Sequence, residues 1–193
     1  QVMLVDCSTY NQPVDGFNDP PLISCTQFPG TFPPYEITVY AGDLVAFNIQ
    51  AVDDDEYSNG NFQNIKLNVS GGQFAFDPVL QQFSLNNTLC DNPPCAVFQD
   101  GSGVVPPLNA PEVVNGVFEW QTHCNHITNE TGCNTTSNVF TFSIKAEDDF
   151  CPANGISIET IKITVVPPIP DFRCVAVNPN GDIELTWEYE PNA

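Results

Sequence analysis

Positively charged residues are scarce in this sequence. Its 193 residues include 4 Lys plus Arg against 24 Asp plus Glu, for a formal net charge of −20. Four cations cannot neutralise the row of phosphates that a nucleic acid presents, so a nucleic-acid partner is excluded. The same charge opposes binding to anionic membranes, and no apolar run approaches the roughly 18–20 residues of a membrane span. Such a chain can attract cations, calcium foremost.

Helical periodicity is nearly absent as well. Short runs of β-branched and aromatic residues recur instead between clusters of Gly, Pro and Asn, and a run such as Val139–Ala146 is apolar at every second position. Many short strands without helices predict an all-β, antiparallel sandwich. The expected strands are Val2–Asp6, Leu22–Cys25, Glu36–Tyr40, Leu44–Val52, Asn64–Val69, Phe74–Phe76, Gly116–Gln121, Val139–Ala146, Ser157–Val166, Phe172–Val177 and Asp182–Glu190.

Two stretches have the composition of linkers. Asn11–Pro21 is rich in Asn, Asp and Pro, and Val166–Pro170 is a stiff, proline-rich segment. The first residues read as the middle of a strand, so we expect a piece of a longer secreted polypeptide. The predicted organisation is the end of a preceding module at 1–14, a β-sandwich at 15–166 with a long insertion at 77–115, a proline linker at 167–170 and the start of a second β-module at 171–193.

The segment that follows the predicted strand Leu44–Val52 carries an acidic motif. Ala51-Val-Asp53-Asp-Asp55, followed by Asn59-Gly60, resembles the A-x-D-x-D…N-G signature of cadherin repeats. Asn115-Gly116-Val-Phe118 and Ala146-Glu-Asp148 follow in the cadherin order, and the latter continues to Cys151-Pro. In detail the segment is similar to the cadherin-like repeats of large surface proteins secreted by gliding and adhesive Bacteroidota. The resemblance implies a Greek-key sandwich of the cadherin or immunoglobulin type over roughly residues 15–166.

The tail resembles a different module. Residues 170–187, with a turn at Asn180-Gly181 and a tryptophan at Trp187, look like the first two strands of a fibronectin type III domain. About 23 residues cannot close such a sandwich. We therefore expect a β-hairpin that lacks a complete sandwich of its own within this chain.

The cadherin resemblance also implies a calcium site. In cadherin repeats the loop after the second strand and the end of the sixth strand share one end of the sandwich, here called the upper pole. The opposite end, which would carry no calcium because Val166–Pro170 contains no acid, is called the lower pole. The implied ligands are the carboxylates of Asp53, Asp55 and Asp148, a carbonyl of Asn59, and the linker residues Asn18 and Asp19. The alternative is that the acidic segment at 53–56 is a solvated turn.

Eight cysteines contain no C-x-x-C pair, so zinc is not expected, and they suggest an oxidising, extracytoplasmic compartment. Cys90 and Cys95 enclose a short proline-containing loop and are expected to pair. In the cadherin strand order Cys124 and Cys133 fall in one connection at the lower pole, which implies a second pair. Cys25 would be the partner of Cys151, with Cys7 as its rival.

The sequence contains no recognisable set of catalytic residues. His123 and His126 flank Cys124, but a catalytic thiolate would not persist among seven other cysteines in an oxidising compartment. Asparagines in N-x-Ser/Thr sequons would be glycosylated in a eukaryotic protein and are incidental in a bacterial one; they are Asn68, Asn86, Asn129 and Asn134.

These features favour a non-catalytic structural or adhesive module of a long extracellular protein at the cell surface. Its partners would be neighbouring modules or identical copies, and an unknown surface ligand. Two alternatives stay open. One is the subunit of an extracellular filament assembled by strand exchange. The other is a carbohydrate-binding accessory module of a secreted enzyme.

Overall fold

The computed structural model describes residues 18–26, 35–127, 138–151 and 153–168 with their side chains, and 171–177 and 183–188 by backbone alone. β-Strands dominate these residues, which confirms the all-β fold. Their one helical element is a three-residue 3-10 turn, η1 (Cys124–His126). No helix within the described ranges is long and apolar enough to cross a membrane.

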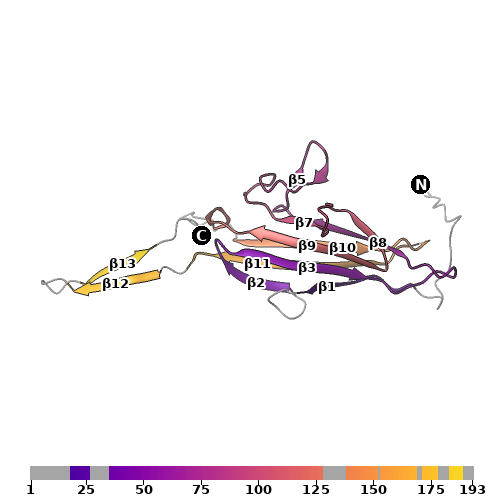
Figure 1. Cartoon of the computed structure of the whole chain (residues 1–193), viewed down its shortest axis with the longest axis horizontal. Coiled ribbons are helices and arrows are strands. Elements are labelled where there is room, and N and C mark those ends of the chain that lie inside the picture. The colour runs from indigo at the N-terminus through magenta and orange to yellow at the C-terminus, as the bar shows by residue number, and fades with distance from the viewer. Residues whose placement is uncertain are drawn as a thin grey trace.

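Two sheets form the body of the molecule (Figure 1). Both mix strands from the two halves of the chain, as Greek-key sandwiches do. Among the strands that the structure describes in these sheets, pairing is antiparallel except between β2 and β11, which run parallel. One sheet has the order β1 (Leu22–Thr26), β3 (Leu44–Val52), β9 (Val113–Gln121), β7 (Val97–Gln99), and the other has the order β2 (Tyr35–Tyr40), β11 (Ile156–Val166), β10 (Val139–Glu147), β4 (Asn64–Ser70), β8 (Leu108–Pro111).

Aromatic side chains fill the space between the sheets. Phe47 of β3 stacks on Phe118 of β9 with ring centroids 4.6 Å apart, and Phe142 of β10 meets Phe118 edge to face at 5.0 Å. Trp120 of β9 is fully buried, and its ring centroid lies 5.5 Å from that of Phe142. Alternate residues of β3, β9 and β10 point into this core because strand side chains alternate between faces.

The chain enters the sandwich at one end and leaves it at the other. The first residue of β1, Leu22, pairs with the last residue of β3, Val52, at the upper pole. At the lower pole Ala41 donates its backbone N–H to the carbonyl of Val166, the last residue of β11. Residues 18–21 and the exit after β11 therefore lie at opposite poles.

The expected insertion at 77–115 is only partly an insertion. It supplies the edge strands β7 and β8 and the first residues of β9, which begins at Val113 rather than Gly116. These strands have three or four residues, too few to show a period-two pattern in sequence. The part outside the sandwich carries a hairpin of β5 (Phe76–Asp77) and β6 (Gln82–Phe83), which Figure 1 shows projecting from the body.

The tail forms a separate two-stranded sheet. β12 (Asp171–Val177) pairs antiparallel with β13 (Ile183–Glu188), with an irregularity between Phe172 and Cys174. Among the described residues these two strands pair only with each other. This agrees with the expected pair of strands, and its assignment to a fibronectin type III domain stays a prediction.

The disulfides agree only in part with those predicted from the sequence. The expected Cys90–Cys95 disulfide is present, with the two Cα atoms 5.7 Å apart. Cys25 carries a thiol whereas Cys151 is disulfide-bonded, so their predicted pairing is wrong. In the register of β1 with β3, Cys25 lies opposite Ile49, three residues after the start of β1 at the upper pole. Three residues of strand span about 10 Å, which exceeds the ~7 Å limit between the Cα atoms of a disulfide. Burial and the charge of Glu159 raise the pKa of the Cys25 thiol to about 12.

The predicted Cys124–Cys133 pair is also not supported. Cys124 carries a thiol in the structure, and Cys133 lies outside the described residues. Cys7, the expected rival partner, and the strand expected at Val2–Asp6 lie outside them as well.

Candidate metal centre

The acidic loop after β3 is folded so that three carboxylates converge. The backbone N–H of Asp53 donates to the carbonyl of Glu112 (2.9 Å), and the N–H of Asp55 donates to Asp53 Oδ1 (3.1 Å). One carboxylate oxygen each of Asp53, Asp54 and Asp55 can be chosen so that all three lie within 4.8 Å of one another. The sequence predicted Asp53 and Asp55 here, and the structure adds Asp54.

Asp53 is the buried member of this cluster. Its side chain is 4% exposed, and its Oδ2 atom has no hydrogen-bond partner. Burial raises the pKa of this carboxyl group to about 6, and the negative charges of Asp55, Asp148 and Asp54 add to that effect, while the Asp55 N–H opposes it. A buried carboxylate oxygen without a donor is unfavourable by itself, and a cation would satisfy it.

Asp148 reaches the same pole from the end of β10, but it is not one of the three residues whose oxygens converge within 4.8 Å, and its role as a ligand stays a prediction. It is 2% exposed. Oδ1 accepts the backbone N–H of Phe150 (2.9 Å), and both oxygens accept the N–H of Gly155 (2.9 Å each). A Cβ atom built on Gly155 would lie 2.4 Å from Asp148 Oδ2, so only glycine allows this approach.

The incoming segment binds to these carboxylates. Asn18 Nδ2 donates to Asp148 Oδ2 (3.0 Å), and the backbone N–H of Asp19 donates to Asp55 Oδ2 (2.8 Å). Residues 18 and 19, predicted as linker ligands, are therefore at the site. The contact of Asp19 comes from its backbone, and a ligand role for its carboxylate stays a prediction.

Asn59 lies in an exposed turn of the same loop. Its side-chain oxygen accepts the N–H of Asn61 (2.9 Å), and the predicted role of its carbonyl stays untested. The turn is tied to the segment after β10 because Tyr57 donates to Asp149 Oδ1 (2.8 Å). Asp149 also accepts the backbone N–H and the side-chain amide of Asn64 (2.9 and 2.8 Å), so its oxygens serve to hold the loop.

Sequence reasoning missed Gln63. It lies between the acidic loop and β4, has 0% exposure, and donates from Nε2 to Asn18 Oδ1 (2.7 Å). No motif in the sequence distinguishes it from other polar residues near a strand start. The signal is structural, because a fully buried glutamine requires partners for its amide.

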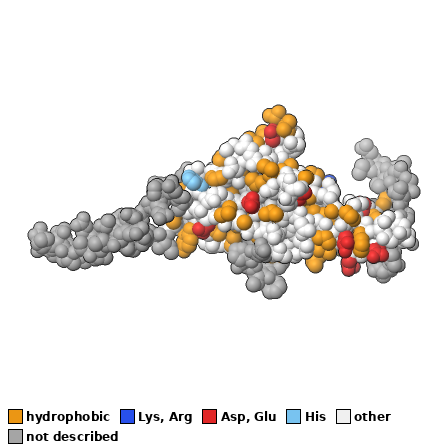
Figure 2. Space-filling model, in the orientation of Figure 1, with side chains coloured by type: hydrophobic (Ala, Val, Ile, Leu, Met, Phe, Trp, Pro, Cys, Tyr) orange, Lys and Arg blue, Asp and Glu red, His pale blue; other side chains and the backbone are white. Residues whose placement is uncertain are grey.

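The donor set fits a hard cation. Every candidate atom is an oxygen. The carboxylates of Asp53, Asp54 and Asp55 converge, the carboxylate of Asp148 and the side-chain amides lie at the same pole, and oxygen-only sites suit calcium. Figure 2 shows acidic side chains gathered near the end of the molecule at which β3 ends. The unpartnered, buried Asp53 Oδ2 favours a cation site over a solvated acidic turn, and the choice between the two stays a prediction.

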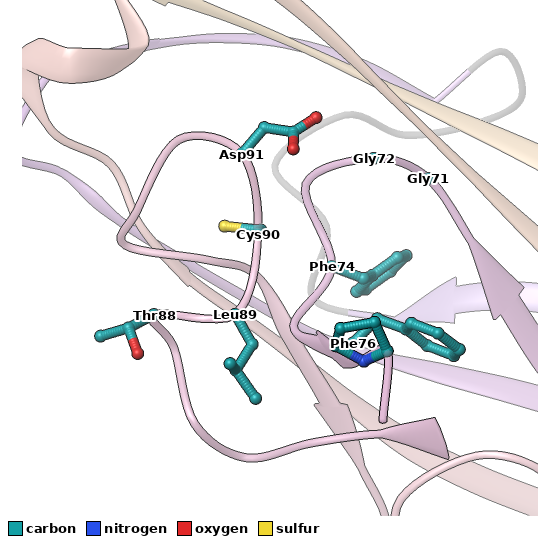
Figure 3. Close-up of a pocket in the computed structure, with 9 residues that line it drawn as sticks. Gly71, Gly72, Phe74, Phe76, Thr88, Leu89, Cys90 and Asp91 are labelled. Atoms are coloured by element: carbon teal, nitrogen blue, oxygen red, sulfur yellow. The ribbon is translucent and has the colours of Figure 1, made fainter. Parts of the chain in front are cut away.

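A surface depression lies at the base of the projecting segment. Gly71 and Gly72 after β4 face the loop that contains Thr88 to Asp91, and the depression between them has a volume of about 530 Å³ (Figure 3). Phe74 and Phe76 line it, and Phe76 is 37% exposed. This size falls in the range of small-molecule sites.

Buried His126 fixes the disulfide loop to the lower pole. Its Nδ1 accepts the backbone N–H of His123 (2.9 Å), and its Nε2 lies 2.8 Å from the carbonyl of Asn92, to which it donates. The ring packs against Trp120 at 4.8 Å between centroids. Both nitrogens of His126 are engaged, so it is not placed to act as a base for the neighbouring Cys124.

This arrangement predicts that the stabilising contribution of His126 is lost on mild acidification. Burial lowers the pKa of His126 below its usual 6.5, and the charge of His123 acts in the same direction, while the carbonyls of Asn92 and Pro94 oppose it. Below pH 6.5 the unfolded chain binds more protons at His126 than the folded chain does. The contribution of His126 to the free energy of unfolding is therefore complete above pH 6.5 and is lost as the pH falls toward the folded-state pKa. Urea unfolding between pH 7.5 and 5 should show a smaller fall for His126→Gln than for the parent or for His123→Gln. Equal falls in all three proteins would contradict this.

Comparisons with known proteins give only distant likenesses. Neither a family model nor a curated protein matches the sequence. One similar solved structure is AggA, the major subunit of aggregative adherence fimbriae type I from Escherichia coli, with 12% identity, a TM-score of 0.40, and 76% of this chain and 95% of that chain covered. The sialic acid binding region of a Streptococcus sanguinis SK1 adhesin has 17% identity, a TM-score of 0.41, and 80% and 33% covered.

A third similar structure is a family 123 glycoside hydrolase from Clostridium perfringens, with 10% identity, a TM-score of 0.39, and 72% of this chain and 23% of that chain covered. This chain thus spans a third or less of the adhesin region and of the hydrolase. All three TM-scores are below 0.5, so these likenesses carry no argument about function.

Proposed function

We propose that this chain is a non-catalytic structural and adhesive module of a long extracellular protein at the cell surface, stiffened by calcium at its upper pole. The unpartnered, buried Asp53 Oδ2 carries the proposal. It lies where the incoming segment, through Asn18 and Asp19, contacts the carboxylates of Asp148 and Asp55. A cation held there would join that segment rigidly to the sandwich.

The path of the chain supports a module that works in series with others. Entry at Leu22 and exit after Val166 lie at opposite poles, so neighbouring modules would extend the molecule along its length. The proposed neighbours are a cadherin-like or other preceding module and a fibronectin type III domain that begins at residue 171.

Exposed apolar residues on the projecting segment would supply an adhesive surface. Val79 and Leu80, at the tip of the β5–β6 hairpin, are 86% and 63% exposed, and Figure 2 shows this tip as a hydrophobic projection. The depression in Figure 3 lies at the base of the same segment and favours a second candidate, carbohydrate binding by an accessory module.

Thermal unfolding with and without calcium tests the proposal. Anything that binds only the folded state stabilises it by mass action, and a calcium concentration about 100 times Kd adds about 2.7 kcal/mol. We expect millimolar calcium to raise the melting temperature and EDTA to lower it. An equal melting temperature in calcium and in EDTA would refute calcium stiffening. Magnesium at the same concentration is the control, and its effect should be smaller.

A further inference from the structure

Gln63 is held in place by its backbone at the upper pole. Its N–H donates to the carbonyl of Asp55 (3.1 Å), and its carbonyl accepts the N–H of Glu112 (3.2 Å). The carbonyl of Glu112 accepts the N–H of Asp53. The backbone of Glu112 is therefore hydrogen-bonded to both Asp53 and Gln63. Gln63 and Asp53 are therefore neighbours across Glu112, and both side chains are buried.

The orientation of the Gln63 amide follows from Asp148. The Asp148 carboxylate can only accept a hydrogen bond, so the side-chain amide of Asn18 must present Nδ2 to it. Asn18 Oδ1 is then turned toward Gln63. Asn18 Oδ1 can only accept, so Gln63 must present Nε2 to it, at 2.7 Å. Exchanging oxygen and nitrogen in either amide would place two acceptors together. Gln63 Oε1 is thereby turned away from Asn18.

Gln63 Oε1 has no hydrogen-bond partner, although the side chain has 0% exposure. Among the described residues, Asp53 Oδ2 is the only other buried side-chain atom in this condition. The two buried oxygens without hydrogen-bond partners, one charged and one neutral, belong to residues that are both hydrogen-bonded to the backbone of Glu112.

We propose that Gln63 Oε1 is a direct ligand of the cation at Asp53, an inference that rests on the calcium site of the proposed function. A neutral amide oxygen increases the number of ligands without adding charge, which suits the six to eight oxygens of calcium better than magnesium, a cation that retains water. The other end of the same amide holds Asn18, so the glutamine connects the cation with the incoming segment.

Terbium luminescence tests this inference, because lifetimes in H2O and in D2O count the water molecules on the bound ion. Gln63→Met keeps the length of the side chain and removes the oxygen. We expect about one additional water on terbium in this variant, and a calcium affinity weaker by at least the about 10–100-fold that the loss of an outer-shell partner costs. Gln50→Leu, on β3, is the matched control and should behave as the parent protein.

The outcomes separate the two proposals. If the parent binds neither terbium nor calcium, the proposed calcium site fails. If the parent binds both and Gln63→Met shows the same hydration number and affinity, the role of Gln63 alone is overturned. Should Gln63→Met not fold, the side-chain carbonyl resonance of Gln63 in the labelled parent serves instead. It must shift with calcium until saturation, and a resonance as unresponsive as that of Gln50 overturns the inference.

Discussion

Replacing Asp53 with asparagine should have opposite effects on stability with and without calcium. In EDTA we expect Asp53→Asn to be at least as stable as the parent, because it removes a buried charge that faces Asp54, Asp55 and Asp148. In calcium the parent gains about 2.7 kcal/mol at about 100 times Kd, and the variant loses most of this gain. Urea unfolding under the two conditions measures both effects.

Asp91→Asn is the control for this reversal. Asp91 is an exposed carboxylate on the rim of the depression in Figure 3, outside the upper pole. It changes the net charge equally and should leave the calcium response unchanged. A variant at position 53 that is less stable than the parent by the same amount in calcium and in EDTA would show that Asp53 acts through protein contacts alone.

Adding one methyl group at Gly116 should destabilise the protein by about 3 kcal/mol or more. A Cβ atom on this residue of β9 would lie 2.1 Å from the ring of Phe98, which is buried on β7. The ring has to leave, and loss of a buried phenylalanine is worth about 3–5 kcal/mol. Urea unfolding of Gly116→Ala measures the effect, and Gly101→Ala, with open space around its Cβ, should change stability by less than about 0.5 kcal/mol.

A double-mutant cycle identifies the cause. In the background Phe98→Ala the obstacle is gone, so Gly116→Ala should cost only a small fraction of its effect in the parent. Equal effects of Gly116→Ala in the two backgrounds would mean that glycine is needed at this position for a reason other than the ring of Phe98.

Much of the fold could be predicted from the sequence because the long strands carry a clear pattern. Leu44–Val52 was predicted with its observed bounds, and β10 and β11 differ from their predictions by one residue each. β11 buries the same face along its whole length: Ile158 is exposed because it lies on the outer face, Ile161 is buried on the inner face, and the pairing with β10 is uninterrupted. Ile158 lies before the part of β11 that pairs with β2, which begins at Ile161.

Only those residues of the candidate site that belong to a sequence motif could be predicted. Asp53, Asp55 and Asp148 stand in recognisable segments, whereas Gln63 and Gly155 acquire their roles from residues far away in sequence. Gln63 is positioned by Asn18, 45 residues earlier, and Gly155 by its approach to Asp148. The wrong Cys25–Cys151 pairing has the same origin. A predicted strand order says which pole a residue is near, but it leaves its position along the strand uncertain by several residues.

A crystal structure of the protein grown in millimolar calcium tests the central claim most directly. We expect density for a cation at about 2.3–2.6 Å from Asp53 Oδ2, the bond length of calcium to oxygen. It would be contradicted by an Asp53 carboxylate hydrogen-bonded only to water or protein, with no cation and with the carboxylates of Asp53 and Asp148 more than about 8 Å apart, which is beyond the reach of one shared ion.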